Sequence, residues 1–168
     1  ELASNAMNLK SIVIYYLWVG NEFPRNRSRL IDGFVGALYK REQLRQTTVK
    51  FSEDEIRIKL AELAFAIHSE ISKGTSVDFD WAINHLQLNL PKPDATSLLE
   101  FAKDMGLLEL KLGLKEKAKV RFQHQLIQEY FAALEFDKRL TDAKSKKRFW
   151  IPKSSSRSSA QEDFVEPL

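Results

Sequence analysis

LLELKLGLKEKAKVRFQHQLIQEYFAALEF, residues 107–136, holds the clearest secondary-structure pattern of the chain. Leucines alternate with polar residues at positions 108, 110 and 112, and the alternation resumes at Val120 and Phe122 after the polar turn GLKEKA. Alternation with period two is typical of a half-buried strand. The stretch therefore predicts a β-hairpin.

A helix over residues 124–136 is predicted to follow the hairpin directly. At 100° per residue, the side chains of Ile127, Tyr130, Phe131 and Leu134 share one side of this helix. His124 lies at the edge of that stripe in the first turn, whereas Glu129 points away.

Three helices are predicted ahead of the hairpin. The first begins at a capping box formed by Ser52 and Glu55, the second is DFDWAINHLQLNL, and the third is capped by Asp94 and ends at Gly106. Three helices, a hairpin wing and a C-terminal helix are the usual order of a winged-helix domain. The predicted fold is mostly α, with this domain over residues 47–137.

The flanking residues predict three further segments. Residues 1–6, ahead of Met7, resemble an expression-tag remnant. Residues 7–46 predict a small helical segment with helices at 8–20 and 27–44, separated by a linker that contains Pro24 and the N-cap Asn26. Residues 138–168 are basic and Ser-rich, which is typical of a mobile tail.

The composition argues against disulfide-rich, zinc-binding and membrane-spanning proteins. The chain has no cysteine and only three scattered histidines, so neither a disulfide framework nor a zinc site is expected. The lack of cysteine also predicts a cytoplasmic location. The apolar run from Ile12 to Val19 is far shorter than the roughly 20 residues of a membrane-spanning helix. The net charge of +3 comes largely from one segment near the C-terminus, so it is weak evidence for a nucleic-acid partner.

His124 is the candidate site residue. One interpretation is a capping or half-buried histidine satisfied by a neighbour. The other follows from the start of the helix, where unpaired N–H groups and the positive dipole end favour an anion and disfavour a charged imidazole. A neutral imidazole there can still donate a hydrogen bond to a phosphate.

FQHQLIQEYFAALEF resembles the signature that closes the winged-helix part of NACHT-type NTPases, a group of STAND signalling switches. The family pattern is approximately F-x-H-x-x-x-Q-E-Y/F-x-A-A. The matching residues are Phe122, His124, Gln128, Glu129, Tyr130, Ala132 and Ala133. FPRNRSRLIDGFVGALYKRE resembles the family's L-P-x-N-R-x-x-L segment, with Pro24, Asn26, Arg27 and Leu30 in place.

The resemblance implies a regulatory role. Residues 7–46 would be the end of the small helical domain that follows a nucleotide-binding core, and His124 would contact the β-phosphate of ADP held by that core. Gln128, Glu129 and Tyr130 match positions interpreted as structural. This chain has Asn8-Leu9 where the family usually has Asn-Pro. The contact that the family's proline makes with adenine is therefore not expected here.

The chain itself is not predicted to be an enzyme. It contains neither a G-x-x-x-x-G-K-[ST] motif nor an acidic strand end of the Walker B type. The resemblance places ADP or ATP with magnesium in a larger parent protein. Its implied partners are that protein's nucleotide-binding core and, on activation, other copies.

The alternative prediction is a free-standing winged-helix nucleic-acid-binding protein. Lys115, Lys117 and Lys119 in the wing favour it, whereas Asp94, Glu100 and Asp104 on the third helix oppose it. The carboxylates at 53–55, and those of Asp78 and Asp80, are interpreted as helix-dipole complements and solvated groups rather than catalytic pairs. His68, His85, Trp18 and Trp81 are interpreted as packing residues.

Overall fold

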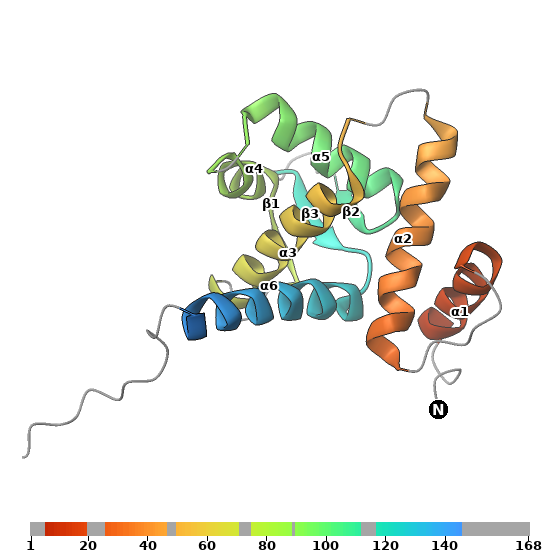
Figure 1. Cartoon of the computed structure of the whole chain (residues 1–168). Helices are drawn as coiled ribbons and strands as arrows, with labels where there is room; N and C mark the ends of the chain where they lie inside the picture. The colour runs from red at the N-terminus through yellow and green to blue at the C-terminus, as the bar shows by residue number, and fades with distance from the viewer. Residues whose placement is uncertain are drawn as a thin grey trace, which may run out of the picture.

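The computed structural model describes residues 6–19, 26–46, 50–70, 75–88, 90–111 and 117–145 (Figure 1). Its elements in chain order are α1 (Ala6–Val19), α2 (Arg27–Arg45), α3 (Glu53–Glu70), β1 (Ser76–Asp78), α4 (Phe79–Gln87), α5 (Lys92–Asp104), β2 (Leu108–Lys111), β3 (Lys119–Phe122) and α6 (Gln125–Ser145). The fold is mostly helical with a small antiparallel sheet, as predicted.

β2 and β3 form the predicted antiparallel pair. Leu108 lies opposite Phe122, and Leu110 lies opposite Val120, so the alternating apolar residues meet in register. The turn between the two strands lies largely outside the described residues. The sheet has a third strand, β1, which pairs with β3 in the order β1-β3-β2. The sequence did not predict β1, because three residues are too few to show a period.

The predicted starts of α2 and α3 are confirmed. The Arg29 N–H donates to the Asn26 side-chain oxygen at 2.9 Å, so Asn26 caps α2. At the start of α3, the Ser52 N–H donates to Glu55 at 2.8 Å, and the Glu55 N–H donates to the Ser52 hydroxyl at 3.2 Å. Both directions of the capping box are therefore formed.

The predicted start of the third helix is wrong. α5 begins at Lys92 with Pro91 as its N-cap residue, and Asp94 lies in the first turn. The first turn of α5 contains Pro93, and proline is tolerated there because the N–H that it lacks would have no partner within the helix. Asp94 forms an ion pair with Lys50 instead of a cap. The end was predicted correctly, since Gly106 has a φ of 80° just beyond α5.

The final helix is longer than predicted. α6 continues to Ser145, so residues 138–145 are helical rather than part of a mobile tail, and residues 146–168 lie outside the described residues. Arg139 donates to Glu135 at 2.7 Å and Lys138 approaches Glu135 to 3.6 Å. These contacts one turn apart stabilise a charged helical surface that carries no apolar period.

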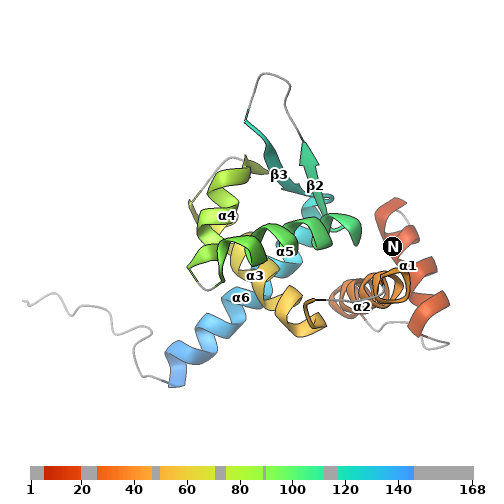
Figure 2. The ribbon, with the colours of Figure 1, turned by 90° about the horizontal axis from the view of Figure 1, so that it is seen from above.

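A single apolar core connects α2 with the elements that follow it. Phe34, Val35 and Leu38 of α2 belong to the same cluster of buried side chains as Leu60 of α3 and Phe131 of α6. From above, α1 and α2 lie together on one side of the molecule, and the β2–β3 hairpin projects from it (Figure 2). The core is thus continuous across the predicted boundary between residues 7–46 and 47–137.

Candidate functional site

His124 lies between the last strand and the last helix. β3 ends at Phe122 and α6 begins at Gln125. The His124 carbonyl accepts hydrogen bonds from the N–H groups of Ile127, at 3.0 Å, and Gln128, at 3.2 Å. Two regular elements therefore fix the backbone at His124, and its half-buried side chain is at the N-terminal end of α6.

Burial lowers the pKa of His124 below its ordinary value, and the nearby cation of Lys10 lowers it further. Lys10 belongs to α1, which comes from the opposite end of the described chain. The sequence did not predict this electrostatic interaction. The imidazole is therefore neutral at pH 7, with one N–H to donate, and it has a lysine ammonium group nearby.

Acid is expected to destabilise the protein through His124. Because the folded pKa is below 6.5, the unfolded chain takes up this proton at higher pH. The contribution to stability is present above pH 6.5 and is lost as the pH falls through the folded pKa. Urea unfolding at pH 7.5 and 5.5 should show a smaller loss for His124→Gln than for the wild type. An identical loss in the two proteins would show that His124 makes no such contribution.

The other residues of the 122–133 motif divide between the interior and the surface. Phe122 is buried against Phe131, with ring centroids 6.0 Å apart, and Gln128 is only 6% exposed. Glu129 is exposed and accepts a hydrogen bond from Gln125 at 2.8 Å. Phe122 and Gln128 therefore face the interior, and Glu129 faces solvent, as the helical period predicted for Glu129.

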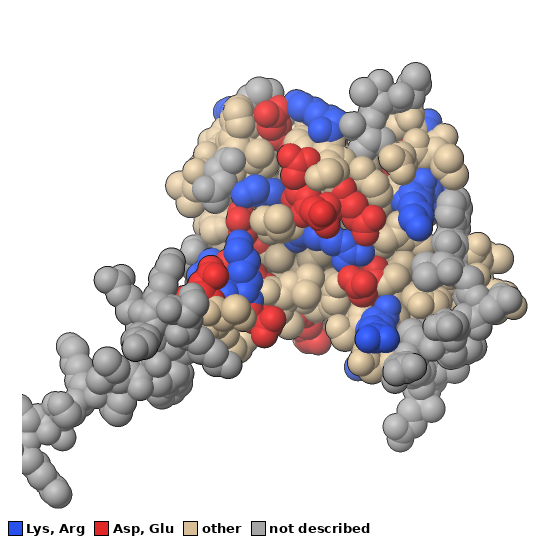
Figure 3. Space-filling model, viewed as in Figure 1, with Lys and Arg blue, Asp and Glu red and all other residues tan. Residues whose placement is uncertain are grey.

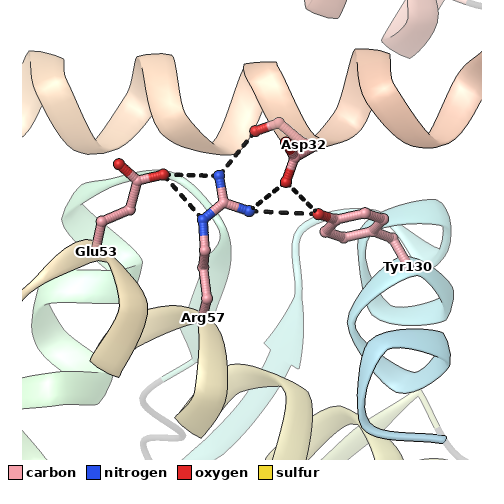
Figure 4. Close-up of polar contacts among 4 residues, drawn as sticks. All are labelled: Asp32, Glu53, Arg57 and Tyr130. Carbon is pink, nitrogen blue, oxygen red and sulfur yellow. Dashed lines mark hydrogen bonds and ion pairs between the residues drawn. The ribbon is translucent and has the colours of Figure 1, made fainter. Parts of the chain in front are cut away.

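Tyr130 joins a polar cluster that connects three helices, formed by Asp32, Glu53, Arg57 and Tyr130 (Figure 4). We call this cluster the Arg57 network. The Tyr130 hydroxyl donates to the Asp32 carboxylate at 2.7 Å. Burial and the adjacent Asp32 raise the pKa of Tyr130 well above its ordinary value, so the hydroxyl stays protonated as a donor.

Arg57 of α3 lies at the centre of the network. Its Nη1 donates to the Asp32 carboxylate at 2.8 Å and to the Tyr130 hydroxyl at 3.3 Å. Its Nη2 donates to the Asp32 main-chain carbonyl at 2.9 Å, and its Nε donates to Glu53 at 2.9 Å. One guanidinium thus fixes the first half of α2 against α3 and α6.

The sequence identified Tyr130 but did not predict its partners Asp32 and Arg57, or Glu53 as a partner of Arg57. Of the second motif, Asn26 caps α2, Arg27 is the exposed first residue of α2, and Pro24 lies outside the described residues. Glu53 and Arg57 lie four residues apart on one helix, so their ion pair could have been predicted from the sequence.

The surface near α5 does not favour nucleic acid. Acidic side chains gather at the centre of the face in Figure 3, where α3 begins with Glu53, Asp54 and Glu55. On α5, Glu100 and Asp104 are exposed beside Lys103. Carboxylates at these positions would repel a phosphate backbone.

The remaining candidate residues are structural or exposed. His85 stacks on Trp81, with ring centroids 5.4 Å apart, as expected of packing residues. His68 is exposed, so its interpretation as a packing residue is wrong, and the Trp18 side chain lies outside the described residues. Within the described ranges, no group of His, Asp and Glu side chains could hold a metal ion. Nor does any helix in those ranges have the length and apolarity to span a bilayer.

Comparisons with family models, curated proteins and solved structures gave no match to this chain.

Proposed function

We propose that this chain is the regulatory helical and winged-helix part of a NACHT-type signalling NTPase. The motif spacing from Phe122 to Ala133 carries the proposal. The order of α3, α4, α5, the β2–β3 hairpin and α6 supports it, because a winged-helix domain has this order. The nucleotide would be ADP or ATP with magnesium, held by a nucleotide-binding core that this chain lacks.

In this proposal His124 senses the diphosphate and holds the switch in its closed state. A neutral imidazole at the start of α6 donates one hydrogen bond to a phosphate oxygen, and the ammonium of Lys10 adds an attractive charge. Loss of the contact releases the module from the core and allows copies of the parent protein to associate. Such a switch requires nucleotide to bind one state better than the other.

Replacing His124 with leucine in the full-length parent protein should weaken ADP retention and raise basal activity. Loss of one hydrogen bond to a charged group corresponds to about 1.5–3 kcal/mol, or roughly a 10- to 150-fold faster release of ADP. The measurement is the rate at which a fluorescent ADP analogue dissociates. His68→Leu is the matched control, because His68 is exposed on α3. Equal dissociation rates for wild type and His124→Leu would refute the sensing role.

A further inference from the structure

A groove of about 430 Å³ opens to the surface between α3 and α6. We call it the Phe136 groove, and its lining residues are Phe65 and His68 of α3 and Glu129, Ala132, Ala133 and Phe136 of α6. The Phe136 side chain is 52% exposed, and Ala133 is exposed as well. The groove therefore presents apolar surface to the outside of the described part of the chain.

Three residues of the 122–133 motif line the Phe136 groove: Glu129, Ala132 and Ala133. The two alanines leave the space open, because their side chains are single methyl groups. Leu140 is half-buried and lies one turn beyond Phe136 on the same side of α6. An apolar track thus runs from the groove along α6 toward the end of that helix at Ser145.

The sequence that follows α6 contains an apolar cluster close enough to enter this groove. Residues 146–148 are Lys, Lys and Arg, and residues 149–151 are Phe, Trp and Ile. Phe136 is nine residues before Ser145, the last residue of α6, which places it about 13 Å back along the helix. The five residues from Ser145 to Trp150 span up to about 17 Å when extended. Trp150 can therefore reach Phe136 if the chain turns back along α6.

Charge distinguishes the Phe136 groove from a second groove of about 130 Å³ between the same two helices. The charged residues that line the second groove are two cations and one carboxylate: Arg57, Lys138 and Glu135. The Phe136 groove has one carboxylate, that of the exposed Glu129, and neither lysine nor arginine among its described lining residues. The basic residues 146–148 are therefore attracted to the Phe136 groove and repelled by the second one.

A second copy of the chain fits this groove less well than the chain's own segment. A stable interface uses about 20–30 residues on each side, and the residues that line the groove are too few for that. A segment of the same chain needs fewer contacts, because its tether keeps it at an effective concentration in the millimolar range. A further exposed apolar row lies on α1, across the molecule from the end of α6 (Figure 1): Leu9, Val13, Tyr16 and Leu17.

We propose that residues 149–151 dock in the Phe136 groove of their own chain, with the Trp150 ring beside Phe136 and Ala133. Buried apolar area and the aromatic pair stabilise this contact. The docked segment covers apolar surface that the motif residues leave exposed, so a partner that binds this groove has to displace the segment. The docking does not rest on the proposed nucleotide role.

Fluorine NMR of the full chain, labelled with 5-fluorotryptophan, tests the docking. The chain has three tryptophans, and Trp150→Phe identifies the Trp150 signal by removing it. At an effective concentration of about 1 mM, a segment with a Kd of about 0.5 mM is docked roughly two-thirds of the time. A dissolved gadolinium chelate should therefore broaden the Trp150 signal about one-third as much as it does when the segment is released.

Substitutions at neighbouring positions of α6 provide the comparison. Ala133→Arg fills the groove and adds a cation, so the broadening of the Trp150 signal should rise about threefold. Leu134→Arg is the matched control, because it adds the same charge in the second groove and should leave the broadening as it is in the wild type. Glu129→Lys reverses the charge at an exposed site of the Phe136 groove and should raise the broadening in the same direction as Ala133→Arg.

Three results would overturn the docking. The first is equal broadening of the Trp150 signal in the wild type, Ala133→Arg and Glu129→Lys. The second is release of Trp150 by Leu134→Arg alone, because it would place the segment in the second groove. The third is broadening that rises on about tenfold dilution of the protein, because only binding between copies depends on concentration.

Discussion

Replacing Arg57 with alanine is expected to lower the free energy of unfolding by about 2–3 kcal/mol. The guanidinium makes hydrogen bonds to Asp32, Glu53 and Tyr130, and it is 15% exposed. Its removal leaves the Asp32 and Glu53 carboxylates without their cation. Asp32 is 60% exposed and Glu53 32%, so water replaces part of the lost interaction and the effect stays below that of a fully buried pair. Urea unfolding followed by circular dichroism measures the change.

Two further variants separate the network from general effects of charge. Arg29→Ala removes an exposed arginine from α2 and should change the free energy of unfolding by no more than about 0.5 kcal/mol. Arg57→Lys keeps the charge but loses the fork of donors, so it should recover only part of the stability. If Arg57→Ala were as stable as Arg29→Ala, the Arg57 network would not connect the three helices.

The parts of the fold that the sequence predicted correctly are those with local causes. Asn26 accepts from an N–H three residues later, and Ser52 and Glu55 satisfy each other across the same separation. Gly106 ends α5 because a positive φ suits glycine. Each of these signals can be recognised within one turn of helix, so no knowledge of the tertiary structure was needed.

The errors in the predicted fold come from contacts between residues far apart in the sequence, which local patterns do not reveal. β1 has three residues and exists because Val77 pairs with Val120 across the sheet. The end of α6 lacks an apolar period, but the Arg139 guanidinium lies over the Phe65 ring of α3, 4.2 Å from the ring centroid. Local composition therefore suggested a tail where a tertiary contact keeps the helix.

The candidate site shows the same division. The motif spacing led to His124, Gln128 and Tyr130 because these residues lie within two turns of one helix. The partners of Tyr130 could not be predicted, since Asp32 is 98 positions away and the Asp32 to Arg57 contact spans 25 positions. The approach of Lys10 to His124 likewise depends on how α1 packs in the folded protein.

The inward face of α6 differs from its predicted face at one position. Ile127, Tyr130 and Phe131 are buried, but Leu134 is 39% exposed and Glu135 takes the buried place beside it. The predicted stripe was therefore correct over the first two turns and wrong at the third. Phe131, at 0% exposure, is among the largest fully buried side chains among the described residues.

Phe131→Ala is expected to lower the free energy of unfolding by about 3–5 kcal/mol and the melting temperature by roughly 10 °C. The Phe131 ring lies 6.0 Å from the Phe122 ring and 5.3 Å from the Tyr130 ring, so its loss opens a cavity where α6 meets the sheet. Phe136→Ala is the matched control one and a half turns later on α6. Its ring is 52% exposed, and the change should stay within about 0.5 kcal/mol. Thermal unfolding of both variants measures the difference. Similar losses of stability in Phe131→Ala and Phe136→Ala would mean that α6 does not turn its Phe131 side toward the core.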